Sequence, residues 1–265
     1  MSKNLEQNKL QAKYNTLYAQ ETVGGLSEAE KRELRVEPVR VEGWPADRKQ
    51  ALVYLARPGG RLLEIGCGQG EVLAALAPYF DEAVGVELSS VRAERTRLAL
   101  AHLDNVRILS QPLENLPDTA VGLFDCIVWA DVIEHVVDVI AAMRILARLS
   151  RPGAQLVTVT PNVAFLPQRL NLLRGRAPNT AIPWMPNEGF LPNPAETPLL
   201  DGGHLHYFTF RQVEILYQIA GFRPELRLGI GARFTRLRNW WPTLLSGLVC
   251  VSGSYTGGKQ LPVEL

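Results

Sequence analysis

Residues 61–88 constrain the fold more than any other stretch of the chain. They read RLLEIGCGQGEVLAALAPYFDEAVGVEL: a short apolar run, a glycine-rich turn, apolar residues at helical spacing, and a second apolar run that ends at Glu87. This order predicts a β-strand, a tight turn, an α-helix and a second, parallel β-strand. Because glycines let the backbone pass close to a ligand, the turn is a candidate binding site.

Strands and helices continue to alternate after this unit. The predicted strands are residues 61–65, 83–86, 106–109, 124–129, 154–160, 222–228 and 244–251. The predicted helices are residues 5–19, 28–34, 45–56, 71–77, 90–102, 136–150 and 210–220. Several of these strands are too apolar to have a solvated face, which indicates an α/β protein with a mostly parallel sheet covered by helices. We expect a helical leader over residues 1–57 and the main domain over residues 58–265.

Composition narrows the class of protein. A chain of 265 residues that is 46% hydrophobic fits one elaborated domain, and a formal net charge of +1 gives no general attraction to nucleic acid. The three cysteines are too few and too scattered for a disulfide framework, so we expect a cytoplasmic protein. No apolar run reaches the length of about 18 residues that a membrane-spanning helix needs.

The segment at residues 161–208 interrupts the alternation. Residues 161–205 contain eight prolines, and apolar side chains such as Trp184, Met185 and Phe190 lie between them. A loop of this length is usually either functional or disordered. Its apolar content argues against disorder, so we expect an insertion that covers a substrate as a lid.

The glycine turn has a carboxylate on each side. Glu87 ends the second predicted strand, where an acidic side chain can accept both hydroxyl groups of a ribose. Dinucleotides and S-adenosylmethionine (SAM) are the two frequent ligands of such turns. Glu64 directly precedes the glycines and would repel a pyrophosphate, whereas it complements the cationic sulfonium and amino group of SAM. SAM is therefore favoured, and a turn that serves only the chain geometry is the alternative.

These motifs in combination resemble those of class I SAM-dependent methyltransferases. The matching pieces are LLEIGCGQG at residues 62–70, GVELS around Glu87, LENLP after the third strand and FDCIVWADVIEHV from the fourth strand onward. The resemblance covers about residues 58–228 and implies a Rossmann-like, doubly wound, seven-stranded sheet with an antiparallel last strand. It implies SAM as the cofactor, with the following contacts: Glu64, Gly66, Cys67, Gly68, Gly70, Glu87, Leu88, Gln111, Leu113 and Trp129. Such enzymes commonly have an aspartate for the adenine amino group, where this chain has Gln111.

Histidines and carboxylates occur in two segments that we expect at the same rim. Glu134 and His135 follow the fourth strand and share a face with Asp131 if the segment is a helical turn. His204 and His206 point the same way if GGHLHYFTF is extended.

Three roles are open for these residues. An imidazole could take the proton from an acceptor hydroxyl, so that the catalytic candidates are His135, His206, His204 and Glu134. Glu134, His135 and one of the later histidines could instead hold a metal ion that lowers the pKa of a hydroxyl. The third role is structural, with the histidines bonded to the backbone. The preferred assignment contains no metal.

Two groups of methyltransferases share parts of this pattern. RNA 3′-terminal 2′-O-methyltransferases are similar in having an E-x-x-E-H segment and a later histidine, although Asp131 stands at the first glutamate here. Ubiquinone-biosynthesis O-methyltransferases and many glycan and natural-product methyltransferases resemble the chain more closely, in EHV, RPGG-L and TPN followed by a HLHYFT-like run. This closer resemblance implies methylation of a hydroxyl on a small molecule such as a phenol, quinone, sugar or natural product. The alternatives are the RNA enzyme and a non-catalytic subunit that binds SAM or a nucleotide.

Arginines and tryptophans gather near the C-terminus. The arginines are Arg223, Arg227, Arg233, Arg236 and Arg238, and Trp240 and Trp241 follow them. Arginine runs of this kind are usually a solvated face. A phosphate-bearing acceptor or an anionic lipid surface is the alternative, and paired tryptophans are typical of membrane interfaces. The expected partner is therefore a small-molecule acceptor and not nucleic acid, and contact of this segment with a membrane surface is the alternative to a solvated face.

Overall fold

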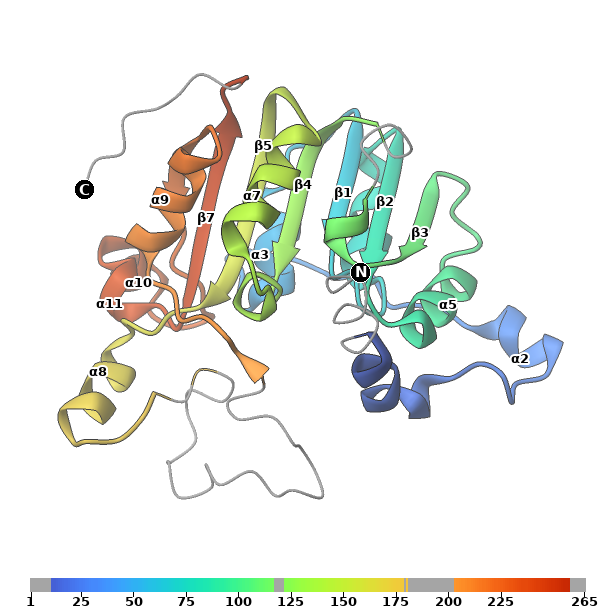
Figure 1. Cartoon of the computed structure of the whole chain (residues 1–265), viewed down its shortest axis with the longest axis horizontal. Helices are drawn as coiled ribbons and strands as arrows, with labels where there is room; N and C mark the ends of the chain where they lie inside the picture. The colour runs from blue at the N-terminus through green and yellow to red at the C-terminus, as the bar shows by residue number, and fades with distance from the viewer. Residues whose placement is uncertain (1–10, 117–121, 179, 181–202, 258–265) are drawn as a thin grey trace.

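The fold is built on a single seven-stranded sheet. The structure is a computed structural model, and it describes residues 11–116, 122–178, 180 and 203–257 (Figure 1). The strands run in the order β3-β2-β1-β4-β5-β7-β6, and β7 is antiparallel to both of its neighbours. Their bounds are β1 Arg61–Ile65, β2 Glu82–Glu87, β3 Val106–Ser110, β4 Phe124–Ala130, β5 Ser150–Pro161, β6 Phe222–Arg227 and β7 Leu248–Tyr255. The predicted doubly wound sheet with an antiparallel last strand is confirmed.

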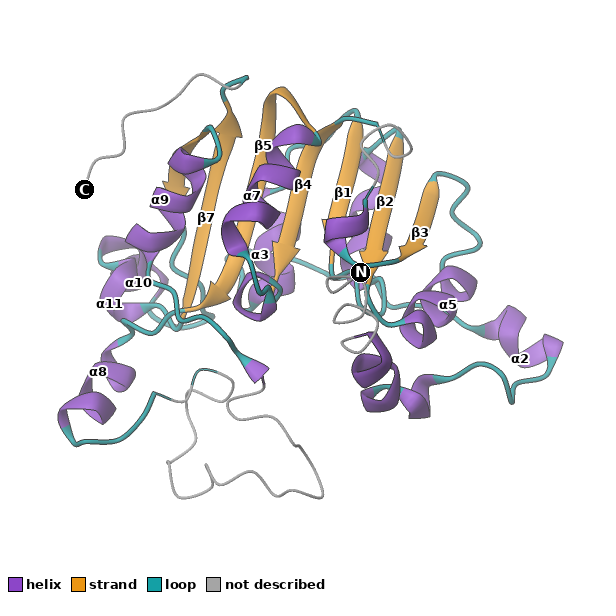
Figure 2. Ribbon diagram, viewed as in Figure 1, coloured by secondary structure: helices purple, strands orange, loops and turns teal. Residues whose placement is uncertain are grey.

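Helices cover both faces of the sheet (Figure 2). The α-helices are α2 Glu28–Glu33, α3 Arg48–Leu55, α4 Glu71–Leu76, α5 Ser90–Ala99, α7 Val139–Arg148, α8 Leu166–Leu173, α9 Phe210–Ile219, α10 Thr235–Trp240 and α11 Pro242–Leu245. The 3-10 helices are η1 Ala19–Glu21, η2 Ala77–Tyr79, η3 Leu113–Asn115 and η4 Ile133–His135, and residues 11–17 are also helical. Residues of α7 and α9 pack in one hydrophobic core, and residues of α3, α4 and α5 pack in the other.

The central strand β4 shows why the sheet is buried on both sides. Phe124, Ile127 and Trp129 belong to the core beneath α7 and α9, while Cys126 and Val128 belong to the opposite core. Each fully buried aliphatic or aromatic side chain contributes about 1.5–3 kcal/mol to stability. A strand that is apolar at almost every position therefore fits only between two helical layers.

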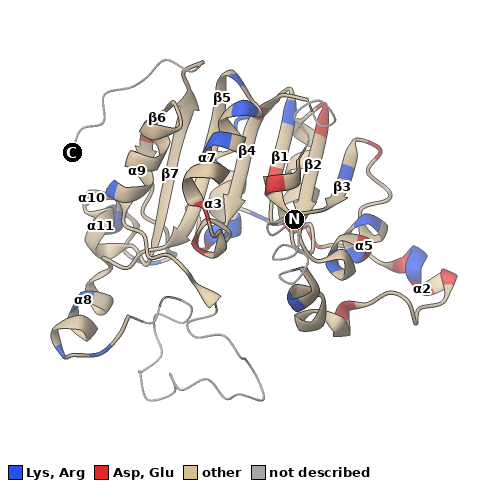
Figure 3. Cartoon of the chain, viewed as in Figure 1, with Lys and Arg blue, Asp and Glu red and all other residues tan. Residues whose placement is uncertain are grey.

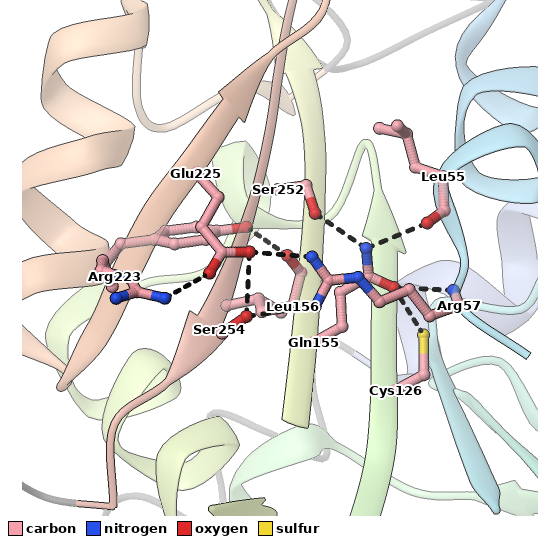
Figure 4. A network of polar contacts seen from close by, with 10 residues as sticks. Leu55, Arg57, Cys126, Gln155, Leu156, Arg223, Glu225, Ser252 and Ser254 are labelled. Atoms are coloured by element: carbon pink, nitrogen blue, oxygen red, sulfur yellow. Dashed lines mark hydrogen bonds and ion pairs between the residues drawn. The ribbon is translucent and has the colours of Figure 1, made fainter. Parts of the chain in front are cut away.

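A polar network ties the end of α3 to the sheet (Figure 4). The side chain of buried Gln155 in β5 accepts a hydrogen bond from the Arg57 backbone N–H at 2.8 Å and donates to the Leu55 carbonyl and the Ser252 hydroxyl, each at 2.9 Å. The guanidinium of Arg57 in turn contacts Glu225 of β6 at 2.9 Å. These contacts fix α3 against β5, β6 and β7, and thereby fix the position of the residues at its amino end.

Several element boundaries differ from the sequence-based expectation. The last strand begins at Leu248 rather than at residue 244, because Pro242 opens the short helix α11. Strand β5 already begins at Ser150 rather than at residue 154, since Ser150, which was predicted as the end of a helix, pairs with Phe124 of β4. Ser27 caps α2 in a capping box, at the start of the helix predicted over residues 28–34. Asp47 caps α3, which therefore starts at Arg48 instead of near Pro45.

Much of the expected lid lies outside the described residues. This part includes Trp184, Met185 and Phe190, so the lid stays an expectation. The flanks are described: α8 follows β5, and residues 203–208 lead into α9, with Phe208 bridging to Asn162. No helix of the described part of the chain is long and apolar enough to span a lipid bilayer.

Candidate functional site

One large cavity lies beyond the carboxyl ends of the parallel strands. Its volume is about 2310 Å³. The turn after β1, the ends of β2 and β4, the loop after β3 and the segment after β5 all contribute to its wall. Of the residues predicted to bind the cofactor, those that line it are Glu64, Gly66, Cys67, Gly68, Glu87, Leu88, Gln111 and Leu113. The cavity is thus at the position where open α/β sheets bind their ligands.

The three glycines of the turn serve different purposes. All have a left-handed backbone, with φ of 72° at Gly66, 53° at Gly68 and 85° at Gly70. A Cβ at Gly66 would lie 2.4 Å from the Val132 side chain, and one at Gly70 would lie 2.8 Å from Leu100. A Cβ at Gly68 would meet nothing within 4 Å, so this glycine leaves open space beside the turn. Gly66 and Gly70 therefore permit close packing, and Gly68 permits the approach of a ligand.

Glu87 is held over the turn by backbone groups. Its carboxylate accepts hydrogen bonds from the N–H of Gly68 at 3.0 Å and of Ser89 at 2.9 Å. Burial raises the pKa of Glu87, while these two hydrogen bonds oppose the increase. The Gln111 N–H also donates to the Glu87 carbonyl at 3.2 Å, which brings the loop after β3 to the same wall. This fixed acceptor matches the position predicted for a ribose contact.

Glu64 supplies a buried carboxyl group with an unused oxygen. Its Oε2 has no hydrogen-bond partner among the described residues. Burial raises the pKa of Glu64 well above its usual range, nearby Glu71 raises it further, and Lys49 opposes both effects. A buried acceptor without a partner is costly unless a ligand satisfies it. The residue therefore fits a cationic ligand group, as the sequence predicts for the sulfonium or ammonium of SAM.

The N-terminal helical segment covers part of this cavity, which the sequence did not indicate. Tyr14 and Tyr18 line the wall, and burial raises the pKa of Tyr14 to about 12. Asn15 anchors the segment because its side-chain oxygen accepts hydrogen bonds from the Ser89 hydroxyl at 3.0 Å and the Ser90 N–H at 2.9 Å. The guanidinium of Arg92 lies 3.4 Å from the centre of the Tyr18 ring. The amphipathic pattern predicted this helix but not its place above the cofactor turn.

The loop after β4 is not the helical turn that was expected. Asp131 adopts a left-handed conformation with φ of 51°, and a 3-10 turn begins only at Ile133. The Asp131 carboxylate pairs with Arg48 of α3 at 2.6 Å instead of sharing a helix face with His135. Left-handed backbone is uncommon outside glycine and is tolerated best by aspartate and asparagine. The turn therefore directs Asp131 toward α3 and leaves Glu134 and His135 as a separate pair.

Glu134 is buried next to His204, beside the loop after β4. Its Oε2 accepts a hydrogen bond from the Thr160 hydroxyl at 2.9 Å, and its backbone carbonyl accepts one from the Leu205 N–H at 2.8 Å. The other carboxyl oxygen lies 4.0 Å from the His204 Nε2. Burial, followed by the neighbouring Asp131, raises the pKa of Glu134 to about 8. Near neutral pH this carboxyl group thus holds a proton in the ligand-free protein.

Two histidines face each other beside Glu134. The rings of His135 and His204 meet edge to face with their centres 4.9 Å apart, and both line the cavity. His135 Nδ1 lies 3.2 Å from the Gly203 carbonyl oxygen, and His204 Nδ1 lies 2.7 Å from the Thr180 hydroxyl. One ligand atom from each of Glu134, His135 and His204 lies within 4.8 Å of the others. The two segments that the sequence predicted at one rim therefore do meet.

Four of the predicted site residues do not line the cavity: Gly70, Trp129, Glu134 and His206. Glu134 is buried beside His135 and His204, which do line it. His206 Nε2 lies 2.9 Å from the Val136 carbonyl oxygen, so this ring ties two loops together. Trp129 is buried in the core, and its indole N–H donates to the Thr158 hydroxyl at 2.6 Å. Gly70 faces α5. The alternation along an extended segment predicted that His204 and His206 point the same way, but only His204 lines the cavity.

Comparison with known proteins shows that the chain is similar to methyltransferases. A methyltransferase domain family matches residues 40–225. A ubiquinone biosynthesis O-methyltransferase of Xanthomonas campestris is 32% identical over 109 residues, and one of Alkalilimnicola ehrlichii is 30% identical over 105 residues. These matches cover 41% and 39% of this chain and 46% and 42% of those proteins, so the chain matches less than half the length of these relatives.

Solved structures share the fold at low sequence identity. The YcgJ protein of Bacillus subtilis superposes with a TM-score of 0.54 at 16% identity, covering 79% of this chain and 98% of that one. The mitomycin 7-O-methyltransferase MmcR superposes with a TM-score of 0.52 at 19% identity, covering 78% of this chain and 53% of that one. Since the family match spans well over half of the sequence, the chain belongs to this methyltransferase domain family and uses S-adenosylmethionine as its cofactor.

Proposed function

We propose that this protein transfers the methyl group of SAM to a hydroxyl oxygen of a small-molecule acceptor. The observation that carries the proposal is the placement of Glu134, His135 and His204 beside the same cavity as the glycine turn. SAM supplies a methyl group that is activated by its cationic sulfonium. The protein therefore has to align the acceptor oxygen with that methyl group and remove the hydroxyl proton.

The cofactor half of the cavity has groups suited to the ribose, the cationic part and the adenine of SAM. The Glu87 carboxylate would accept the two ribose hydroxyls, since its oxygens retain lone pairs beyond the two backbone hydrogen bonds. Glu64 would face the cationic part, where its unpaired oxygen gains a partner. Gln111 lines the cavity beyond Glu87 and would accept from the adenine amino group through its amide oxygen. Binding of a cation beside Glu64 favours its ionised form and so releases a proton.

The acceptor half contains a histidine suited to act as a general base. The Gly203 carbonyl can only accept a hydrogen bond, so Nδ1 of His135 carries the proton and Nε2 is the basic nitrogen. In the proposed step, Nε2 takes the hydroxyl proton as the oxygen gains the methyl group. His204 packs edge-on against the His135 ring and holds its orientation. Glu134 fixes both segments through its backbone and side-chain hydrogen bonds.

Two further observations support an oxygen acceptor of small size. The relatives cited above are named O-methyltransferases, although they are matched over less than half of their length. The cavity of about 2310 Å³ exceeds the roughly 300–1,000 Å³ of a typical small-molecule site, which leaves room for an acceptor beside the cofactor.

The proposal is tested by following labelled methyl groups. Wild-type protein is incubated with SAM that carries a tritiated methyl group and with cell extract, which is then separated into small molecules, lipid-linked glycans, RNA and protein. We expect label in a small-molecule fraction, and much less of it with the His135→Ala variant. Label confined to RNA or protein would refute the small-molecule acceptor. If SAM binds but no fraction is labelled, a non-catalytic binding subunit becomes the better account.

A metal-assisted variant of the reaction is the second candidate. The proximity of Glu134, His135 and His204 favours it, since two imidazoles and a carboxylate are common ligands of transition metals. Ligand atoms around one zinc ion are about 3.4 Å apart for bonds near 2.1 Å, so the present spacing of up to 4.8 Å would have to contract. Activity that is lost in EDTA and restored by Mn²⁺ or Zn²⁺ would support this variant. Insensitivity to EDTA would remove it and leave the metal-free base.

Methylation of an RNA 3′ end would be one case of this metal-assisted reaction, and it has less support than a small-molecule acceptor. The cavity wall mixes both signs of charge. Its carboxyl groups are Asp47, Glu64, Glu71, Glu87, Glu114, Asp131 and Asp138, and its basic side chains are Lys13, Arg48, Lys49, Arg92 and Arg238. Arg48 pairs with Asp131 and Lys49 with Glu71. Proteins that bind RNA usually offer a basic surface, and this wall does not have that character.

A further inference from the structure

One corner of the molecule exposes large apolar side chains on two adjacent segments. Trp240 and Trp241 of the α10–α11 segment are 75% and 50% exposed, and Leu173 at the end of α8 is 83% exposed. Further exposed apolar side chains of this corner are Leu166, Leu170, Leu172, Phe234 and Leu237. Soluble domains rarely leave so many large apolar groups together in water unless they bind something. We call α8, α10 and α11 with these side chains the α8–α11 corner.

The two segments of the corner are held together by Asn162. Its side-chain amide donates to the carbonyl oxygens of Thr243 at 3.0 Å and Ser246 at 2.8 Å, and its backbone N–H donates to the Gly247 carbonyl at 2.9 Å. Figure 1 shows α8 at the same end of the molecule as α10 and α11, opposite α2. The exposed side chains of both segments therefore belong to one end of the molecule.

Phe234, Trp240 and Trp241 are the exposed aromatic residues of the α8–α11 corner. Phe234 adopts a left-handed conformation with φ of 58° and is 74% exposed. Such a conformation is unfavourable for an aromatic residue, and strained residues that persist often mark functional positions. The rings of Trp240 and Trp241 pack edge to face at 6.0 Å, which stiffens the pair. Tryptophan prefers the boundary between lipid headgroups and acyl chains.

The charge of the corner has a single sign. Residues 162–180 and 226–257 contain arginines but no aspartate or glutamate. Figure 3 shows the contrast with the region of α2 and α5, where both signs are mixed. The exposed arginines of the corner are Arg169, Arg174, Arg176, Arg233 and Arg236. Because the whole chain has a net charge of only +1, positive charge is concentrated at this corner.

Apolar and aromatic groups ringed by arginine match the chemistry of an anionic bilayer. We propose that the α8–α11 corner docks on an anionic phospholipid surface, with the tryptophans and leucines in the interface and the arginines at the headgroups. The same elements border the cavity, since Phe165, Pro167 and Arg238 are part of its wall. Docking therefore places the membrane next to the cavity. The inference does not depend on the proposed acceptor.

Vesicle flotation with the full chain tests the proposal. The vesicles contain either phosphatidylcholine alone or about one-third phosphatidylglycerol. We expect wild-type protein to float with the anionic vesicles and much less with the neutral ones. The double variant Arg233→Gln/Arg236→Gln should bind anionic vesicles roughly thirtyfold more weakly, since each arginine near the surface contributes a factor of about five. Trp240→Ala/Trp241→Ala should weaken binding at least about tenfold.

Matched variants elsewhere on the surface control for lost charge and lost aromatic area. Arg32→Gln/Arg35→Gln removes two exposed arginines at α2, and Tyr79→Ala removes a ring that is 64% exposed near the start of β2. Both should float as wild type does, and all variants should keep wild-type affinity for SAM as a check of folding. Wild-type protein that stays unbound with anionic vesicles would overturn the proposal, and so would equal losses in the control variants. A lipid-free dimer broken by Trp240→Ala/Trp241→Ala would assign the corner to a second copy instead.

Discussion

The environment of Glu134 can be tested without knowledge of the acceptor. Because folding opposes the ionisation of this carboxyl group, the stability of the protein should depend on pH. Burial raises the pKa of this carboxyl group from 4.5 to about 8. A group whose pKa is raised on folding binds its proton more tightly in the folded state. Its contribution to stability is therefore complete below the unfolded pKa and is lost as the pH rises through about 8.

Glu134→Gln removes this titration while keeping the shape of the side chain and an oxygen for Thr160. Between the two pKa values, the free energy of unfolding of wild-type protein should fall by about 1.4 kcal/mol per pH unit relative to the variant. We therefore expect the free energy of unfolding of the variant, relative to that of wild type, to increase by roughly 3 kcal/mol between pH 5 and pH 7.5. The relative increase arises because, above the unfolded pKa, the wild-type carboxyl group in the folded protein must either keep a proton that it would lose in the unfolded chain or ionise while buried. Both cost free energy.

Urea unfolding at a series of pH values, followed by circular dichroism, measures this difference. The protein is kept free of SAM and metal ions, since either could stabilise the ionised carboxylate. Glu33→Gln, which changes an exposed carboxylate at the end of α2, controls for the change in net charge. A difference between Glu134→Gln and wild type that stays constant with pH would refute the reasoning, because it would mean that the folded protein tolerates the ionised group.

Three further predictions concern the histidines and the glycine turn. His135→Ala should lower turnover at least about a hundredfold and leave the affinity for SAM unchanged. His206→Ala should lower turnover less than about tenfold, because that ring only ties two loops together. Equal losses of turnover in the two variants would contradict the assignment of the base. Gly66→Ala should lower the free energy of unfolding in urea by about 2 kcal/mol or more, because φ at this position is 72° and the new Cβ would lie 2.4 Å from Val132. An unchanged unfolding midpoint would contradict this expectation. Tyr14→Ala should weaken SAM binding without lowering the unfolding midpoint, since Tyr14 lines the cavity from the leader; unchanged affinity would show that this segment does not cover the cofactor.

The features that depend on local sequence were predictable. Apolar periodicity and glycine spacing identified β1, the turn and α4, and the carboxylates Glu64 and Glu87 follow directly from their places beside the turn. The strand β4 was recognised because it is apolar at almost every position, which is typical of a strand covered on both faces. The association of His135 with His204 was expected because both follow strands whose carboxyl ends meet at one edge.

The features that depend on distant contacts were not predictable in the same way. No local pattern indicates that Tyr14 covers the turn or that Arg48 pairs with Asp131. The left-handed backbone of Asp131 depends on the packing around the loop, so the helical turn expected there was wrong. The shift of the last strand has a simpler cause, because the short apolar run after Pro242 is compatible with a helix or a strand and only the tertiary context decides between them.

The most direct test of the central claim is isothermal titration of SAM into the wild-type protein and the Glu87→Ala variant. Glu87 is the fixed acceptor at the end of β2, and charge-assisted hydrogen bonds of this kind contribute about 1.5–3 kcal/mol. The account predicts saturable binding of one SAM per chain, weakened at least about tenfold in the variant. Absence of heat with SAM, together with binding of NAD, would contradict the assignment of this cavity to a methyl donor.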